Sequence, residues 1–128
     1  MSLRALVVDD SRLARKLLSV ALQNTAAIDW QLQFAESGLE AIKCLKEFEF
    51  DLVLTDVNMP ELSGQGLLRY IRAQPRFAEL PVVIVSSVGS GSVFSDLVEM
   101  GATLVLSKPI NTPESMARLS EVVAELLR

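Results

Sequence analysis

Several short apolar runs in this sequence end in side chains that can do chemistry. They end in a pair of acids, a lone acid, a hydroxyl and an amine: Asp9 and Asp10, Asp56, Ser86, and Lys108. Such runs are typical of buried strands, and in open α/β sheets ligands collect at the carboxyl ends of the strands. The residue types indicate phosphoryl transfer, because acids hold a hard divalent cation and a lysine neutralises a phosphoryl oxygen.

Three carboxylates can share one small site only if a cation offsets their repulsion. Without it, some of the acids would be forced to protonate. Mg²⁺ prefers oxygen ligands, needs only one or two carboxylates, and keeps waters or a phosphate oxygen in its other positions. Asp56 would then be the nucleophile, Ser86 a hydroxyl donor and Lys108 a movable positive charge.

Each of these elements has a simpler explanation when it is taken alone. Asp56 is followed by the turn residues Asn58 and Pro60, so it is as well explained as the cap of a turn. An Asp pair before a helix is more often a helix cap than a metal site. The specific signal is the conjunction, because all these side chains fall at strand ends on one side of one predicted sheet.

Alternating strands and helices are expected to position these side chains. Hydrophobic periodicity predicts strands at 4–10, 29–34, 51–55, 80–87 and 103–107. It predicts helices at 11–22, 37–48, 67–72, 93–100 and 112–128, with Ser11, Ser37 and Thr112 as N-caps. This order predicts an α/β fold, a doubly wound five-stranded parallel sheet of the flavodoxin-like (βα)5 type. In the strand order 2-1-3-4-5 the first and third strands are neighbours, so the three acids converge.

Two segments carry more detailed expectations. Strict polar–apolar alternation over 29–34 predicts an edge strand with one face in water. The apolar positions of the first helix are expected to face the core: Leu13, Leu17, Leu18, Ala21 and Leu22. We interpret Arg12, Arg15 and Lys16 on the same helix as a solvated face. The glycines and serines at 89–92 are expected to form a flexible loop.

The composition excludes several classes of protein. The chain of 128 residues suits one domain, and its net charge of -4 argues against direct nucleic-acid binding. It has no histidine and one cysteine, which excludes His-based catalysis and an internal disulfide. No apolar segment reaches the roughly 18 residues of a membrane span, and no secretory signal is evident, so a cytoplasmic protein without membrane association is expected.

The sequence resembles the receiver domain of two-component response regulators, of which the single-domain chemotaxis type is the familiar example. The resemblance covers residues 4–128, with every motif in the family's order and spacing. The motifs are Asp9-Asp10-Ser11, Asp56-Val57-Asn58-Met59-Pro60, Gly64, Val85-Ser86-Ser87, Gly101-Ala102 and Lys108-Pro109. It implies a bacterial signalling protein that is switched by phosphorylation and is not a conventional enzyme.

The resemblance also implies a role for each site residue. Asp56 would be the phosphoacceptor, Ser86 the switch hydroxyl, and Lys108 the contact to the phosphoryl group. The bond between Lys108 and Pro109 is expected to be cis. The phosphoryl donor would be a phosphohistidine on a sensor histidine kinase or a phosphotransfer protein.

A magnesium site is implied at the same place. Asp10 and Asp56 would bind Mg²⁺ directly, together with the backbone carbonyl of Asn58. Asp9 would bind through a water molecule.

Two positions concern the response to phosphorylation. Val105 stands where many family members carry a Tyr or Phe whose ring swings inward on activation. Val88 lies two residues beyond Ser86, at a position that affects phosphoryl hydrolysis in the family. Loss of the ring leaves open how the signal reaches the face formed by the last two helices and the strand between them.

Two further functions remain as alternatives. A degenerate receiver would serve only as an interaction module, although Asp9, Asp10, Asp56, Ser86 and Lys108 are all present. An Asp-nucleophile phosphatase of the haloacid dehalogenase type would need Asp-x-Asp after its first strand, whereas here the two acids are adjacent.

The sequence leaves the output open. The chain is either one stand-alone domain, residues 1–128, or a receiver cut from a longer protein. Its partner would be a downstream protein or a fused output domain. Homodimerisation through the last two helices and the strand between them is a family habit that the sequence leaves undecided.

Overall fold

A five-stranded parallel sheet forms the centre of the computed structural model, which describes residues 2–87 and 91–128. The strands are β1 (Ser2–Val8), β2 (Asp29–Ala35), β3 (Leu52–Asp56), β4 (Val82–Ser86) and β5 (Leu104–Ser107), in the order β2-β1-β3-β4-β5. The helices are α1 (Arg12–Gln23), α2 (Gly38–Glu47), α3 (Gly64–Ala73), α4 (Gly91–Glu99) and α5 (Pro113–Leu126), with a 3₁₀ turn η1 at Pro75–Phe77. The predicted doubly wound fold and strand order are confirmed.

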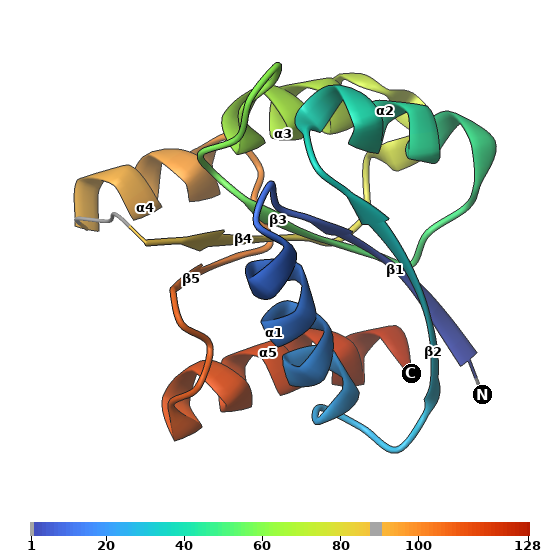
Figure 1. Ribbon diagram of the computed structural model, residues 1–128, viewed down its shortest axis with the longest axis vertical. Coiled ribbons are helices and arrows are strands. Elements are labelled where there is room, and N and C mark those ends of the chain that lie inside the picture. The colour runs from blue at the N-terminus through green and yellow to red at the C-terminus, as the bar shows by residue number, and fades with distance from the viewer. Residues whose placement is uncertain (1, 88–90) are drawn as a thin grey trace.

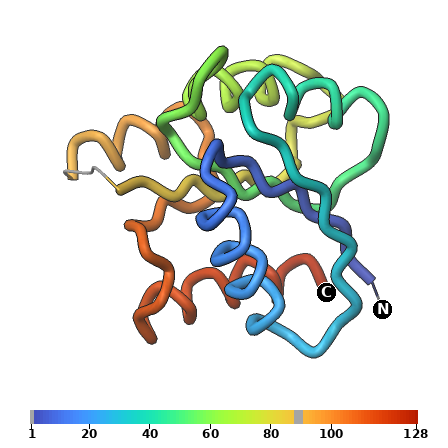
Figure 2. Tube along the Cα trace, viewed as in Figure 1, coloured from blue at the N-terminus to red at the C-terminus, as the bar shows by residue number. Residues whose placement is uncertain are grey.

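The helices cover both faces of the sheet, as Figure 1 shows. Helices α1 and α5 pack on one face, and α2, α3 and α4 pack on the other. The trace in Figure 2 shows the chain returning through a helix between successive strands. A hydrophobic cluster lies between the sheet and the helices on each face, and both clusters consist mainly of Leu, Val, Ile and Ala. Strands β3 and β4 are buried along their whole length. Their continuous apolar runs are explained by burial on both faces.

Strand β2 is the edge strand that the alternating pattern predicts. Trp30 and Leu32 pack on the cluster beneath α1 and α5, while Gln31 and Gln33 are exposed. Phe34, the last apolar residue of the alternating pattern, is 42% exposed and does not reach the core.

Side-chain caps fix where the helices begin. The hydroxyls of Ser11, Ser37 and Thr112 accept hydrogen bonds from the backbone N–H three residues on, which confirms all three predicted N-caps. Ser63 does the same for α3, so this helix begins at Gly64 rather than at residue 67 as predicted. A serine that accepts from the N3 amide satisfies a donor that the helix itself leaves unpaired.

Other predicted boundaries also need correction, among them the ends of the first strand, which is Ser2–Val8, and of the last helix, which ends at Leu126. Asp51 lies before β3 and is not part of the strand. Its carboxylate accepts a hydrogen bond from the Arg4 N–H at 2.8 Å. Strand β4 is shorter than the predicted 80–87. Gly91 and Ser92 belong to α4 rather than to a loop, while 88–90, including Val88, lie outside the described residues.

Helix α1 buries a narrower stripe than predicted. Leu18, Ala21 and Leu22 are buried, but Leu13 is 66% exposed and Leu17 is 55% exposed. The sheet covers only one stripe of a helix, and an apolar residue on the adjacent stripe faces solvent. The expectation that Leu13 and Leu17 face the core is therefore wrong. Within the described chain, no helix has the length and hydropathy needed to cross a membrane.

Glycine at position 64 is required because the backbone of Asp56 lies against it. A Cβ built on Gly64 would lie 2.2 Å from the carbonyl oxygen of Asp56 and 2.9 Å from the Cα of Val57. The Gly64 N–H donates to the Val57 carbonyl at 2.8 Å, which closes the loop after β3.

We predict that Gly64→Ala lowers the free energy of unfolding by about 1–3 kcal/mol, because the backbone that carries Asp56 must move. Gly91→Ala is the matched control, since an added Cβ there meets nothing within 4 Å. It should be neutral or stabilising by up to about 1 kcal/mol, since alanine has the higher helix propensity. Urea unfolding of both variants checks this, and equal effects would contradict the steric account.

Candidate functional site

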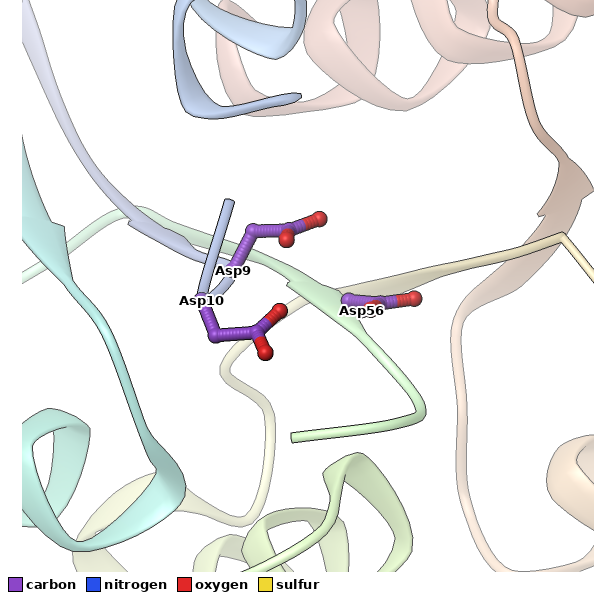
Figure 3. A group of neighbouring side chains, drawn as sticks. All are labelled: Asp9, Asp10 and Asp56. Atoms are coloured by element: carbon purple, nitrogen blue, oxygen red, sulfur yellow. The ribbon is translucent and has the colours of Figure 1, made fainter. Parts of the chain in front are cut away.

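Three carboxylates meet where β1 and β3 end side by side. Val8 pairs with Thr55 in the sheet register, so Asp9 and Asp10 emerge next to Asp56. One oxygen of each acid lies within 4.8 Å of the others. Figure 3 shows the three side chains as neighbours at this edge of the sheet. The predicted convergence of the three acids is confirmed.

Asp9 is the most completely bonded acid of the cluster. It is 1% exposed, and its Oδ1 accepts from the Ser11 N–H at 2.9 Å while its Oδ2 accepts from Lys108 Nζ at 2.6 Å. Its own N–H donates to the Ala35 carbonyl at 3.1 Å. Asp9 therefore ties the β1 turn to β2 and to the end of β5.

Asp56 is buried but poorly bonded. It is 6% exposed, and its Oδ1 has no hydrogen-bond partner in the described structure. The nearest cation, Lys108 Nζ, lies 3.4 Å from Oδ1, which is an ion-pair distance without hydrogen-bond geometry. Burial raises the pKa of the Asp56 carboxyl and nearby Asp9 raises it further, while Lys108 acts in the opposite direction.

Lys108 reaches the cluster from the end of β5. Burial opposes its charge, yet the hydrogen bond from Lys108 to Asp9 and the charge of Asp56 together raise the pKa of this lysine. It therefore stays protonated at neutral pH. Its N–H donates to the Ser86 carbonyl at 2.9 Å, and the Lys108–Pro109 bond is cis, as predicted.

The remaining predicted residues lie at the same edge. Ser86 is 2% exposed and ends β4, which pairs with β3 through Asp56 and Val85. Asn58 is exposed, two residues beyond Asp56 in the loop toward α3. The roles of the Ser86 hydroxyl and of the Asn58 carbonyl stay predictions.

The cluster has the chemistry of a hard-cation site. Asp10 is exposed and Asp56 Oδ1 is buried without a hydrogen-bond partner among the described residues, so both can offer an oxygen to an ion. Carboxylate oxygens are the ligands that Mg²⁺ prefers, and one or two of them suffice. The donor set therefore fits Mg²⁺.

A groove that sequence reasoning missed opens beside Lys108. Its cavity has a volume of about 740 Å³ and lies between α1 and the segment that leads into α5. Apolar side chains line most of it: Leu17, Val20, Ile110 and Met116. The sequence did contain a signal, because α1 has more apolar positions than one buried stripe can use.

The sequence interpretation also placed Arg15 wrongly. Its side chain is 14% exposed, and its Nη1 donates to the main-chain carbonyl of Asp9 at 2.8 Å. Its Nη2 lies 3.5 Å from Glu36 Oε1. Arg12 and Lys16 are exposed as predicted, but Arg15 is not part of a solvated face.

Comparison with known proteins gives a consistent result. Residues 5–120 match the family model of the response regulator receiver domain. A probable chemotaxis protein CheY of Rhizobium etli is 30% identical, with 97% of this chain and 95% of that protein covered. The hybrid signal transduction histidine kinase A of Dictyostelium discoideum is 33% identical over 95% of this chain, which spans only 6% of that protein.

Solved structures give the same picture. The chemotaxis response regulator CheY4 of Vibrio cholerae matches with a TM-score of 0.81 at 28% identity, covering 95% of this chain and 99% of that chain. A putative response regulator of Chloroflexus aurantiacus matches with a TM-score of 0.84 at 26% identity, covering 97% and 99%.

We predict that Asp56→Asn stabilises the cation-free protein at neutral pH, by about 1 kcal/mol, the usual size of a single-residue effect. The raised pKa of Asp56 means that the folded state binds this proton more tightly than the unfolded state. Stability is therefore lost as pH rises from the unfolded pKa through the folded pKa, and the amide removes that loss.

Urea unfolding in a chelator at several pH values checks this. The difference between Asp56→Asn and the wild type should shrink as the pH is lowered toward the ordinary range of an Asp carboxyl. Asp96→Asn, an exposed acid on α4, is the control and should change little. A destabilised Asp56→Asn at neutral pH would contradict the account.

Proposed function

The chain belongs to the response regulator receiver family, and from this we propose that it is a signalling switch phosphorylated on Asp56. Receiver domains are generally signalling switches in two-component systems. The observation that carries the proposal is the buried Oδ1 of Asp56, which lacks a hydrogen-bond partner in the described structure yet lies 3.4 Å from a lysine. A carboxylate oxygen in this state is available to attack phosphorus.

The proposed reaction is a transfer between two nucleophiles. An oxygen of Asp56 attacks the phosphorus of a phosphohistidine, the P–N bond breaks, and its electron pair returns to the imidazole of the donor. Bound Mg²⁺ would supply charge neutralisation for the acids and for the transferred group. Asp10, Asp56 and the Asn58 carbonyl would hold it directly, and Asp9 through water.

Lys108 is proposed to stabilise the transferred group. Its ammonium is held by Asp9 at 2.6 Å and stands 3.4 Å from Asp56, so little movement would bring it to a phosphoryl oxygen. A charge that is positioned in advance costs no reorganisation at the moment of reaction.

Ser86 is the proposed first element of the response. It ends the strand beside Asp56, and its carbonyl accepts from the Lys108 N–H, so both residues belong to one hydrogen-bonded edge. Val105 is 3% exposed and packed in the core, and a valine has no ring that could swing inward. We place the output on the α4–β5–α5 face, toward a downstream protein, a fused domain or a second copy.

The groove along α1 is the surface we propose for the phosphoryl donor. It lies beside Lys108, and exposed Arg12 and Lys16 are on the same helix, which contains no acidic residue. An amphipathic helix with apolar and acidic side chains would complement it. Such a helix would belong to a cytoplasmic sensor kinase or phosphotransfer protein.

The alternative of a phosphorylation-independent module is disfavoured by the same cluster. Acids within 4.8 Å of one another repel, which is a cost that a mere scaffold has no reason to retain. Absence of Mg²⁺ binding in calorimetry would favour that alternative. Rapid turnover of a phosphatase substrate would instead favour the hydrolase.

We predict that acetyl phosphate and Mg²⁺ add one phosphoryl group to the wild-type chain, detected by intact mass. Asp56→Asn should abolish the addition, since no other acid takes the nucleophile's position. Asp51→Asn should be phosphorylated normally, because Asp51 precedes β3 at the end opposite Asp56. The assignment fails if Asp56→Asn is still phosphorylated at the wild-type rate.

We predict that Leu17→Glu slows transfer from a phosphohistidine donor at least about tenfold, because an apolar contact with the docked donor is lost and a like charge faces its acidic side chains. The donor would be the fastest one found in a panel of autophosphorylated sensor kinases. Transfer from acetyl phosphate, which needs no docking surface, should stay unchanged. Leu39→Glu, an equally drastic change at an exposed leucine on α2, is the control. Equal loss with both donors would refute docking at this groove.

A further inference from the structure

Arg15 connects three separate parts of the sheet edge. It lies one turn into α1, yet its guanidinium reaches back to the Asp9 carbonyl at 2.8 Å. The same group lies 3.5 Å from Glu36, between β2 and α2. With 14% of its side chain exposed, it is largely withdrawn from solvent, unlike its neighbours Arg12 and Lys16.

The Asp9 carbonyl is part of the peptide group that joins Asp9 to Asp10. The N–H and both carboxylate oxygens of Asp9 already have partners: Ala35, Ser11 and Lys108. The bond from Arg15 engages the remaining polar atom, the carbonyl, and thereby fixes the orientation of the Asp9–Asp10 peptide.

Asp10 depends on this peptide for its position. Its side chain is exposed and makes no hydrogen bond or ion pair with any other described residue. Among the described contacts, only the backbone therefore holds the Asp10 side chain where its carboxylate can reach the space beside Asp56 (Figure 3).

We propose that Arg15 is a positioning residue for the divalent-cation site, holding the Asp9–Asp10 peptide so that the Asp10 carboxylate stays beside Asp56. This inference rests on the proposed function. It concerns cation affinity, so it can fail independently of phosphorylation.

The charge of Arg15 and its geometry act in opposite directions. A positive charge near the acids repels an incoming cation, so removing that charge alone would tighten cation binding. Loss of the hydrogen bond would loosen the peptide and weaken binding. The sign of the effect therefore distinguishes a positioning role from a simple electrostatic one.

Calorimetric titration of the full chain with Mg²⁺ provides the test. Arg15→Gln should raise the Kd about three- to tenfold, less than the loss of a direct outer-shell partner, because Arg15 acts through the backbone. Arg15→Lys keeps the charge but loses the planar fork, and it should weaken binding at least as much. Arg12→Gln removes the same charge from the same helix and should leave the Kd unchanged or slightly lower.

Kinetics supply the second readout. With acetyl phosphate, the Mg²⁺ concentration for half-maximal rate should rise by the same factor in Arg15→Gln, while the rate at saturating Mg²⁺ stays within about twofold. A role in stability alone would lower the free energy of unfolding and leave the Kd unmoved. Glu36→Gln, a milder change at an exposed residue, should produce a smaller shift in the same direction.

An unchanged or tighter Kd in Arg15→Gln would overturn the proposal. If Arg15→Gln does not fold, an unchanged Kd in both Arg15→Lys and Glu36→Gln would overturn it equally. A wild-type chain that binds Mg²⁺ but is never phosphorylated would refute the proposed function. The Kd values of the Arg15 variants would still test the positioning role of Arg15.

Discussion

Repulsion among three carboxylates is the constraint on which the rest of this site depends. Their oxygens lie within 4.8 Å of one another, and two of the three acids are buried. Among the described residues, only Lys108 forms ion pairs with these carboxylates. Its Nζ lies closer to Asp9 than to Asp56. Asp56 is thus left with a raised pKa and a buried oxygen that lacks a hydrogen bond. A divalent cation would be favoured by this imbalance, because it offsets the repulsion among the acids.

The order of the strands in the sheet brings the residues of this cluster together. Parallel pairing of β1 with β3 puts the acids together, and β4 and β5 bring Ser86 and Lys108 to the same edge. The absence of a Cβ at Gly64 lets the next loop pack against the Asp56 carbonyl, and the Gly64 N–H bond to the Val57 carbonyl closes that loop. Arg15 fixes the opposite side of the site through the Asp9 carbonyl. The segments that carry Asp9, Asp10 and Asp56 are therefore held by backbone contacts from several elements.

Much of this could be predicted from the sequence because it follows from short-range patterns. Apolar runs located four of the strands, and polar–apolar alternation located the fifth, the edge strand β2. What the sequence could not give depends on tertiary contacts. Periodicity marks Leu17 as apolar without saying which stripe of α1 the sheet covers, and Arg15 looks like its solvated neighbour Arg12 until its distance to Asp9 is known. Position 91 joins a helix although glycine has low helix propensity, because helix propensity is a weak local preference.

The claim at the centre of this account is that Asp56 carries the phosphoryl group. Borohydride reduces an acyl phosphate to an alcohol, which would convert a phosphorylated aspartate into homoserine. Wild-type protein treated with acetyl phosphate and Mg²⁺, then reduced and digested, can be read by tandem mass spectrometry. The account predicts homoserine at position 56 and at no other acid. Homoserine at position 9 or 10, or its absence from a phosphorylated chain, would contradict it.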